Sequence, residues 1–108
     1  MDILDSVEKI KEFIEGFDFE EFSKDTKTIY AVVRALEIIG EATKNLPDSL
    51  KVKHPEVPWR DIAGFRDKVV HGYFGVDLEV VWDTAVEDAP LLKLLIAKIL
   101  DEMEAGSC

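Results

Sequence analysis

Apolar residues recur at helical spacing along most of the chain. Between positions 2 and 15 they follow steps of four, three and four, at Ile3, Val7, Ile10 and Ile14. This spacing places them on one face of a helix, which Gly16 ends. An acidic stretch with three phenylalanines follows, at Phe17, Phe19 and Phe22. An aromatic cluster without basic neighbours is typical of a core, so we expect a short helical turn whose rings pack inward.

The longest pattern predicts a helix that begins at a cap, Ser23 or Asp25, and ends near Asn45. At 1.5 Å per residue it would be roughly 30 Å long, enough to form the spine of a bundle. Gly40 inside this helix lowers helix stability by about 1 kcal/mol relative to alanine. We therefore expect that the glycine is there because another helix approaches closely. The predicted apolar face consists of Ile29, Val32, Val33, Leu36, Ile39 and Thr43.

The second half of the chain predicts further helices. Leu50–His54 forms one turn, and Pro58-Trp59-Arg60-Asp61 begins a helix with Ile62, Phe65 and Val69 facing the core. Asp77 caps a last helical region, in which Pro90 predicts a kink or a fresh start near Asp88–Pro90. Its apolar stripe comprises Leu78, Val81, Trp82, Ala85, Val86, Ala89, Leu92, Ile96, Ile99 and Met103. Because no useful period-2 alternation occurs, the predicted fold is an all-α up-and-down helical bundle.

Composition narrows the class of protein. A length of 108 residues fits a single domain, which we place at 1–104, followed by a frayed tail at 105–108. The single cysteine, Cys108, excludes an internal disulfide framework and a cysteine-based zinc site. No apolar run approaches the ~20 residues that span a bilayer, and the acidic start does not resemble a signal peptide. We expect a cytoplasmic protein with no membrane contact, in which His54 is a solvated loop residue without a metal role.

The net charge of −10 argues against a general nucleic-acid binder, but its distribution is uneven. Residues 1–23 and 69–108 each carry a net charge of −6, whereas residues 24–68 carry +2. Local potential decides whether a phosphate can approach a cleft, so an RNA site in the middle third remains open.

The segment Ile62–Phe74 contains the chain's most distinctive chemistry. Arg66, His71 and Tyr73 give the spacing R-x4-H-x-Y. On a regular helix Arg66 and Tyr73 lie about 20° apart, but Arg66 and His71 lie about 140° apart. Either the helix ends at Val70–Gly72, or a two-fold dimer brings two copies of the motif into one groove.

An arginine and a histidine suit RNA cleavage, because the ribose 2′-OH is an internal nucleophile that needs a proton carrier and a cation. The chemistry implies no metal ion or cofactor. The spacing also fits a structural pair, with Arg66 bonded to Asp67 or Glu41 and His71 hydrogen-bonded at a helix end. Arg34, Glu37 and Glu41 share a helix face. They form either an ion-pair ladder or, for Arg34 and Glu41, part of the cleft around the motif.

Three segments together resemble the HEPN superfamily, specifically its HepT-like (DUF86) branch. These are Arg34–Ala42 (RALEIIGEA), Pro58–Gly64 (PWRDIAG) and Arg66–Tyr73, which is followed by Phe74-Gly75-Val76-Asp77. The resemblance covers about residues 2–103. It implies a helical bundle, a homodimer with paired motifs at its interface, and metal-independent endoribonuclease activity.

The resemblance also assigns roles. Arg66 and His71 take the family's catalytic positions, and Asp67 takes the polar position after the arginine. Such proteins are typically toxins whose antitoxin, a nucleotidyltransferase of the MNT type, adds AMP to the tyrosine that corresponds to Tyr73. This chain departs from the family in Gly72, where an acidic residue is frequent. The competing hypothesis, favoured by the acidic balance, is a non-catalytic HEPN module that binds the nucleotidyltransferase partner or a nucleotide.

Overall fold

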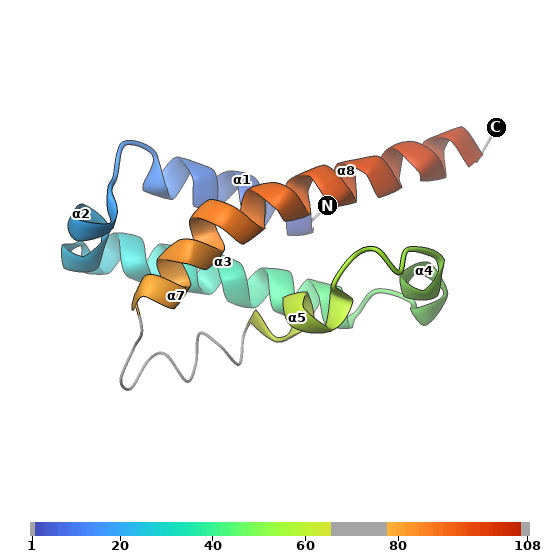
Figure 1. The fold of residues 1–108 in the computed structure, drawn as a ribbon, viewed down its shortest axis with the longest axis horizontal. Helices are drawn as coiled ribbons and strands as arrows, with labels where there is room; N and C mark the ends of the chain where they lie inside the picture. Colours follow the sequence, from blue (N-terminus) through green and yellow to red (C-terminus); the bar gives the residue numbers. More distant parts are fainter. Residues whose placement is uncertain (1, 66–77, 107–108) are drawn as a thin grey trace.

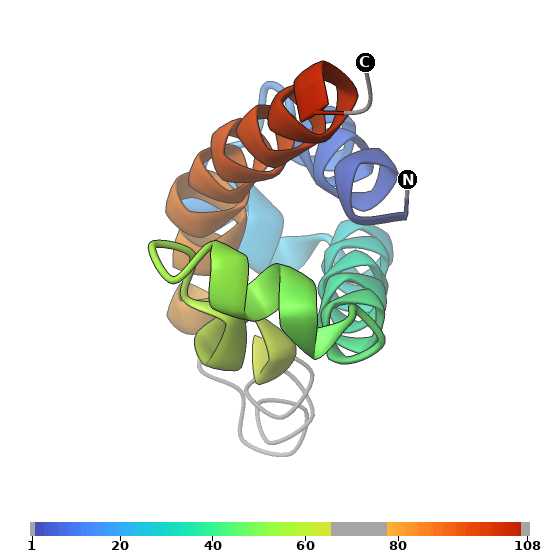
Figure 2. The same cartoon turned by 90° about the vertical axis from the view of Figure 1, so that its right-hand side faces the viewer.

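The computed structural model describes residues 2–65 and 78–106, and three long helical stretches dominate them (Figure 1). They are α1 (Asp2–Ile14), α3 (Thr26–Lys44) and the continuous run of α7 (Leu78–Asp83), η2 (Thr84–Asp88) and α8 (Ala89–Gly106). The shorter helices are α2 (Phe19–Lys24), α4 (Asp48–Lys53) and α5 (Trp59–Ala63). Helix α1 packs against both α3 and α8, and in the end view the helices surround a common core (Figure 2). The predicted all-α bundle is confirmed, with no strand in the described ranges.

The predicted apolar faces of the first two long helices form the centre of this core. Ile3 and Ile10 of α1 are almost completely buried, as are Leu36 and Ile39 of α3. Thr43, on the same face of α3, is also buried, and its hydroxyl donates to the carbonyl oxygen of Ile39 at 2.8 Å. A buried hydroxyl without such a partner would cost free energy, so this bond explains why threonine is tolerated there.

The corner between α1 and α3 depends on local backbone chemistry. Gly16 has a φ of +80°, in the left-handed region that glycine adopts most readily, and it ends α1 as predicted. Asp18 and Asp25 cap α2 and α3, each accepting the backbone N–H three residues later. Of the two predicted caps for α3, the structure therefore has Asp25. Phe22 is fully buried, with its ring centroid 5.1 Å from that of Trp82.

In the last helical run α8 begins at Ala89, which confirms the fresh start predicted near Asp88–Pro90, but part of the predicted apolar stripe is wrong. Proline has no N–H, and the preceding turn is a π-helix in which the N–H of Ala89 bonds to the carbonyl oxygen of Thr84. The prediction of Val86 and Met103 as core residues is wrong, because they are 41% and 53% exposed. The wider π turn changes the helical phase at Val86, and Met103 lies towards the C-terminal end of α8. The predicted cap at Asp77 lies outside the described residues.

Within the described ranges, no helix is both long enough and apolar enough to cross a membrane.

Candidate functional site

The residues that directly precede the R-x4-H motif pack into the core. Ile62 of α5 and Phe65 are 4% and 3% exposed, which confirms the predicted core face of this segment as far as Phe65. Helix α5 packs against α3. The chain enters the motif directly after Phe65 and continues at Leu78, the first residue of α7. The predicted site residues Arg66, Asp67, His71 and Tyr73, together with Val69 and Gly72, lie outside the described residues.

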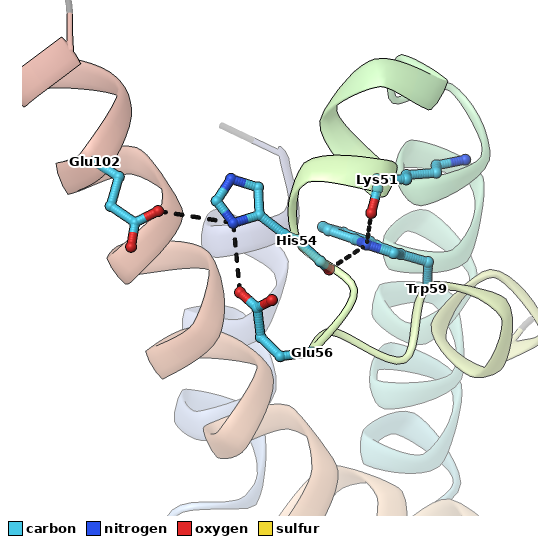
Figure 3. A network of polar contacts seen from close by, with 5 residues as sticks. All are labelled: Lys51, His54, Glu56, Trp59 and Glu102. Atoms are coloured by element: carbon cyan, nitrogen blue, oxygen red, sulfur yellow. Dashed lines mark hydrogen bonds and ion pairs between the residues drawn. The ribbon is translucent and has the colours of Figure 1, made fainter.

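Helix α5 is held at its start by the indole of Trp59. Its Nε1–H donates to two carbonyl oxygens, those of Lys51 at 3.1 Å and His54 at 2.9 Å (Figure 3). These carbonyls belong to the C-terminal end of α4, where the backbone lacks helical donors. The indole therefore joins the end of α4 to the beginning of the helix that leads to Arg66. Helix α4 itself begins at Asp48, two residues before the predicted Leu50.

On α3, Arg34 and Glu37 form the ion pair expected from their spacing. Arg34 Nη1 lies 3.3 Å from Glu37 Oε2, and the two side chains are 63% and 22% exposed. Exposed ion pairs of this kind contribute about 0–1 kcal/mol to the free energy of unfolding, so the fold does not depend on the guanidinium of Arg34. Glu41 is half-buried and lies two turns further along the helix. That Arg34 and Glu41 line the cleft of the motif stays a prediction, because the motif residues lie outside the described ranges.

An exposed apolar surface adjoins the residue that precedes the motif. Leu91 and Leu94 of α8 are 56% and 70% exposed, and the neighbouring Leu95 is half-buried. We call Leu91, Leu94 and Leu95 the leucine patch. Leu91 and Leu95 line a small hollow of about 140 Å³ together with Ile62 and Phe65. The sequence predicts a dimer interface of apolar surface from the last helices and the motif helix, but these leucines were not singled out, although the run Leu91–Leu95 holds more leucines than one helix face can bury.

His54 is not a solvated loop residue, which corrects the prediction. It is 6% exposed, and its Nδ1 lies 3.4 Å from Glu56 Oε1 and 3.7 Å from Glu102 Oε2 (Figure 3). Glu102 belongs to α8, so the cluster connects the end of α4 to a helix 48 residues away in sequence. The hydrogen bond with its own backbone N–H, supported by the His54 imidazole, lowers the pKa of the Glu56 carboxyl.

This cluster does not amount to a metal site. No group of three or more histidine, cysteine or acidic side chains in residues 2–65 and 78–106 is arranged to hold an ion.

The chain is a helical bundle in which the segment between α5 and α7 contains Arg66, His71 and Tyr73. The family model for HepT-like ribonucleases ("Ribonuclease HepT-like") matches residues 3–99, and the chain belongs to this family. Membership supports the endoribonuclease class expected from the sequence.

Individual relatives agree with the family match. The chain is 55% identical to a "Probable ribonuclease HepT" of Thermococcus cleftensis over 92 residues, which cover 85% of this chain and 84% of that protein. It is 46% identical to a "Putative RNase" of Caldanaerobacter subterraneus subsp. tengcongensis, over 93% of this chain and 89% of the relative. A "Putative RNase" of Methanocaldococcus jannaschii is 44% identical over 95% and 85% of the two chains. No solved structure matches this chain.

Proposed function

We propose that this chain is a metal-independent endoribonuclease that cleaves RNA by transesterification, with Arg66 and His71 as its reacting pair. The family match over residues 3–99 carries the proposal, because that range contains both residues. The names of the relatives support the same activity. The buried Phe65 directly before Arg66 gives the motif a fixed starting point on the core.

The proposed reaction balances with one proton carrier and one cation. The ribose 2′-oxygen attacks the adjacent phosphorus, the bond from phosphorus to the 5′-oxygen breaks, and the products are a 2′,3′-cyclic phosphate and a 5′-hydroxyl. His71 takes the proton from the 2′-OH and passes it to the leaving 5′-oxygen, or performs one of these two transfers while water performs the other. Arg66 binds two phosphate oxygens and stabilises the negative charge that develops on them.

Substitution of the two residues tests this chemistry. Arg66→Ala and His71→Ala should each lower the cleavage rate by at least about 100-fold, and Arg66→Lys should restore little, because an ammonium cannot make the bidentate contact. Arg60→Ala is the matched control, since Arg60 is an exposed arginine on α5. Cleavage should persist in EDTA. Full activity in His71→Ala would refute the mechanism, and a pure dimer without any cleavage would favour the non-catalytic module.

The proposal includes a homodimer that places two motifs beside each other. The leucine patch supports this arrangement, because neighbouring exposed leucines on one helix suit a partner surface, and two of them line one hollow with Phe65. A two-fold axis near the patch would bring the residues after Phe65 of both chains towards one groove.

A charge on the patch should separate the two chains. Leu94→Glu places a carboxylate in the proposed interface, so sedimentation at micromolar concentration should show a monomer, with RNA cleavage reduced in parallel. Val52→Glu is the matched control, because Val52 is 78% exposed on α4 and is not part of the patch. A Leu94→Glu protein that remains dimeric would refute this interface, and an active wild-type monomer would refute the paired site.

The remaining part of the proposal concerns regulation in the cytoplasm. We infer that the chain is the toxin of a two-gene system, and that a nucleotidyltransferase antitoxin of the MNT type transfers AMP from ATP to the phenolic oxygen of Tyr73. The added phosphate would compete with RNA for Arg66, and the nucleoside would fill the groove. Inhibition then requires no change of fold.

Mass spectrometry tests the modification. Incubation with the partner and Mg-ATP should add AMP to the peptide that contains Tyr73 and leave the peptide with Tyr30, the other tyrosine of the chain, unchanged. Tyr73→Phe should stay toxic in the presence of the partner, whereas Tyr30→Phe should be neutralised. If Tyr73→Phe is neutralised as well as the wild type, the partner acts by binding alone.

A further inference from the structure

A groove lies between α4 and the C-terminal half of α8, separate from the leucine patch. Its volume is about 650 Å³, within the range of small-molecule sites. Its lining is largely apolar and includes Leu46, Leu50, Trp59, Ile96, Ile99 and Met103. Met103 is half-exposed at its edge. The proposed ribonuclease chemistry uses none of these residues.

His54 is one of the residues that line this groove. Its side chain is only 8% exposed. Its Nδ1 faces the carboxylates of Glu56 and Glu102, while the other ring nitrogen points away from both (Figure 3). Within the part of the chain that the structure describes, Nε2 has no hydrogen-bond partner, and it is not sealed from the surface.

The two carboxylates determine what Nε2 can do. An ionised carboxylate only accepts hydrogen bonds, so Nδ1 must carry the proton of its 3.4 Å hydrogen bond with Glu56. In the neutral imidazole Nε2 is then an acceptor with a free lone pair. Nearby cationic side chains are Lys53, which lines the groove, and Lys98, whose charge acts on Glu56.

We propose that this groove binds a small aromatic molecule that donates one hydrogen bond to His54 Nε2. The apolar walls, which include Trp59, suit a flat ring, and the free lone pair selects a ring with an N–H or O–H group. The carboxylates hold the imidazole in one orientation, as a binding site requires.

Indole and benzofuran provide matched probes, since they share a shape and differ in the N–H donor. Chemical shifts of the ¹⁵N-labelled full chain, including the His54 ring nitrogens, would be followed during titration with each probe. We expect saturable shifts at groove residues and an affinity for indole about three- to tenfold higher than for benzofuran. One net hydrogen bond produces an affinity ratio of this size. Equal affinities, or no saturable shifts at the groove, would overturn the proposal.

Substitutions test whether both probes bind in the groove and whether His54 causes the preference for indole. His54→Phe keeps a ring but removes Nε2, so it should bind indole and benzofuran equally. Met103→Glu places a charge at the exposed edge and should weaken both probes, which keeps the test decisive if His54→Phe does not fold. Val52→Glu, exposed on α4 outside the groove lining, should change neither affinity. Preference for indole that survives in His54→Phe would refute the role of His54. RNA cleavage by the Val52→Glu protein reports separately on the ribonuclease proposal.

Discussion

Replacing Trp59 by phenylalanine tests how the beginning of α5 is anchored. The change keeps a large ring in the core but removes the Nε1–H that bonds to the carbonyl oxygens of Lys51 and His54. Each of these carbonyls retains a second donor, since Lys51 O accepts the N–H of His54 at 3.3 Å and His54 O accepts the N–H of Val57 at 3.2 Å. Neither oxygen is therefore left without a partner.

The expected loss of stability follows from this accounting. A buried carbonyl left unpaired would cost about 1–3 kcal/mol, whereas the loss of one net hydrogen bond costs about 0.5–1.5 kcal/mol. Because the backbone donors remain, we expect Trp59→Phe to lower the free energy of unfolding by about 1 kcal/mol beyond the change in ring size. For a domain of this length that corresponds to a decrease in Tm of roughly 4 °C.

Trp82→Phe provides the control for ring size. Trp82 is half-buried against Phe19 and Phe22, and within the described residues its indole donates no hydrogen bond. Unfolding in guanidinium chloride should be followed by far-UV circular dichroism, because both variants change the fluorescence, and at one protomer concentration, because a dimer would shift the midpoint. Equal losses in the two variants would refute the anchoring role. A loss above about 3 kcal/mol for Trp59→Phe would show that the carbonyls become unpaired.

Three further predictions address other parts of the fold. The bond of Glu8 with Lys93 connects α1 to α8 and lowers the pKa of the Glu8 carboxyl below its ordinary value of 4.5. Its contribution to stability is thus present above pH 4.5 and lost as the pH falls through the lowered pKa, so Glu8→Gln should flatten acid unfolding curves over that range. Gly16→Ala should destabilise the chain by about 1 kcal/mol in thermal unfolding, because the φ of +80° disfavours a side chain although the space beside it is open. Phe22→Ala should cost about 3–5 kcal/mol in denaturant unfolding, because the ring is fully buried, whereas an equal effect of Phe17→Ala, at a half-buried position, would contradict this burial argument.

The sequence determined those features that depend on near neighbours along the chain. The apolar faces of α1 and α3 follow from the 3.6-residue period, which a sequence displays directly, and both are buried except for the half-buried Ile14 and Ile29. Gly16 ends a helix and Asp25 caps one for reasons that involve only a few adjacent residues. The family was also evident from short segments in a fixed order, and the match to residues 3–99 confirms it.

Tertiary structure alone decided the features that depend on distant segments. His54 looked solvated between two lysines and a proline, but α8 brings Glu102 to it and buries the imidazole. The indole of Trp59 finds its carbonyl partners only because α4 ends beside it. Likewise, Leu94 is exposed and Ile96 is buried, although both are apolar and two residues apart. Helical period shows that such residues lie on different faces, but only the packing of the other helices decides which face is covered.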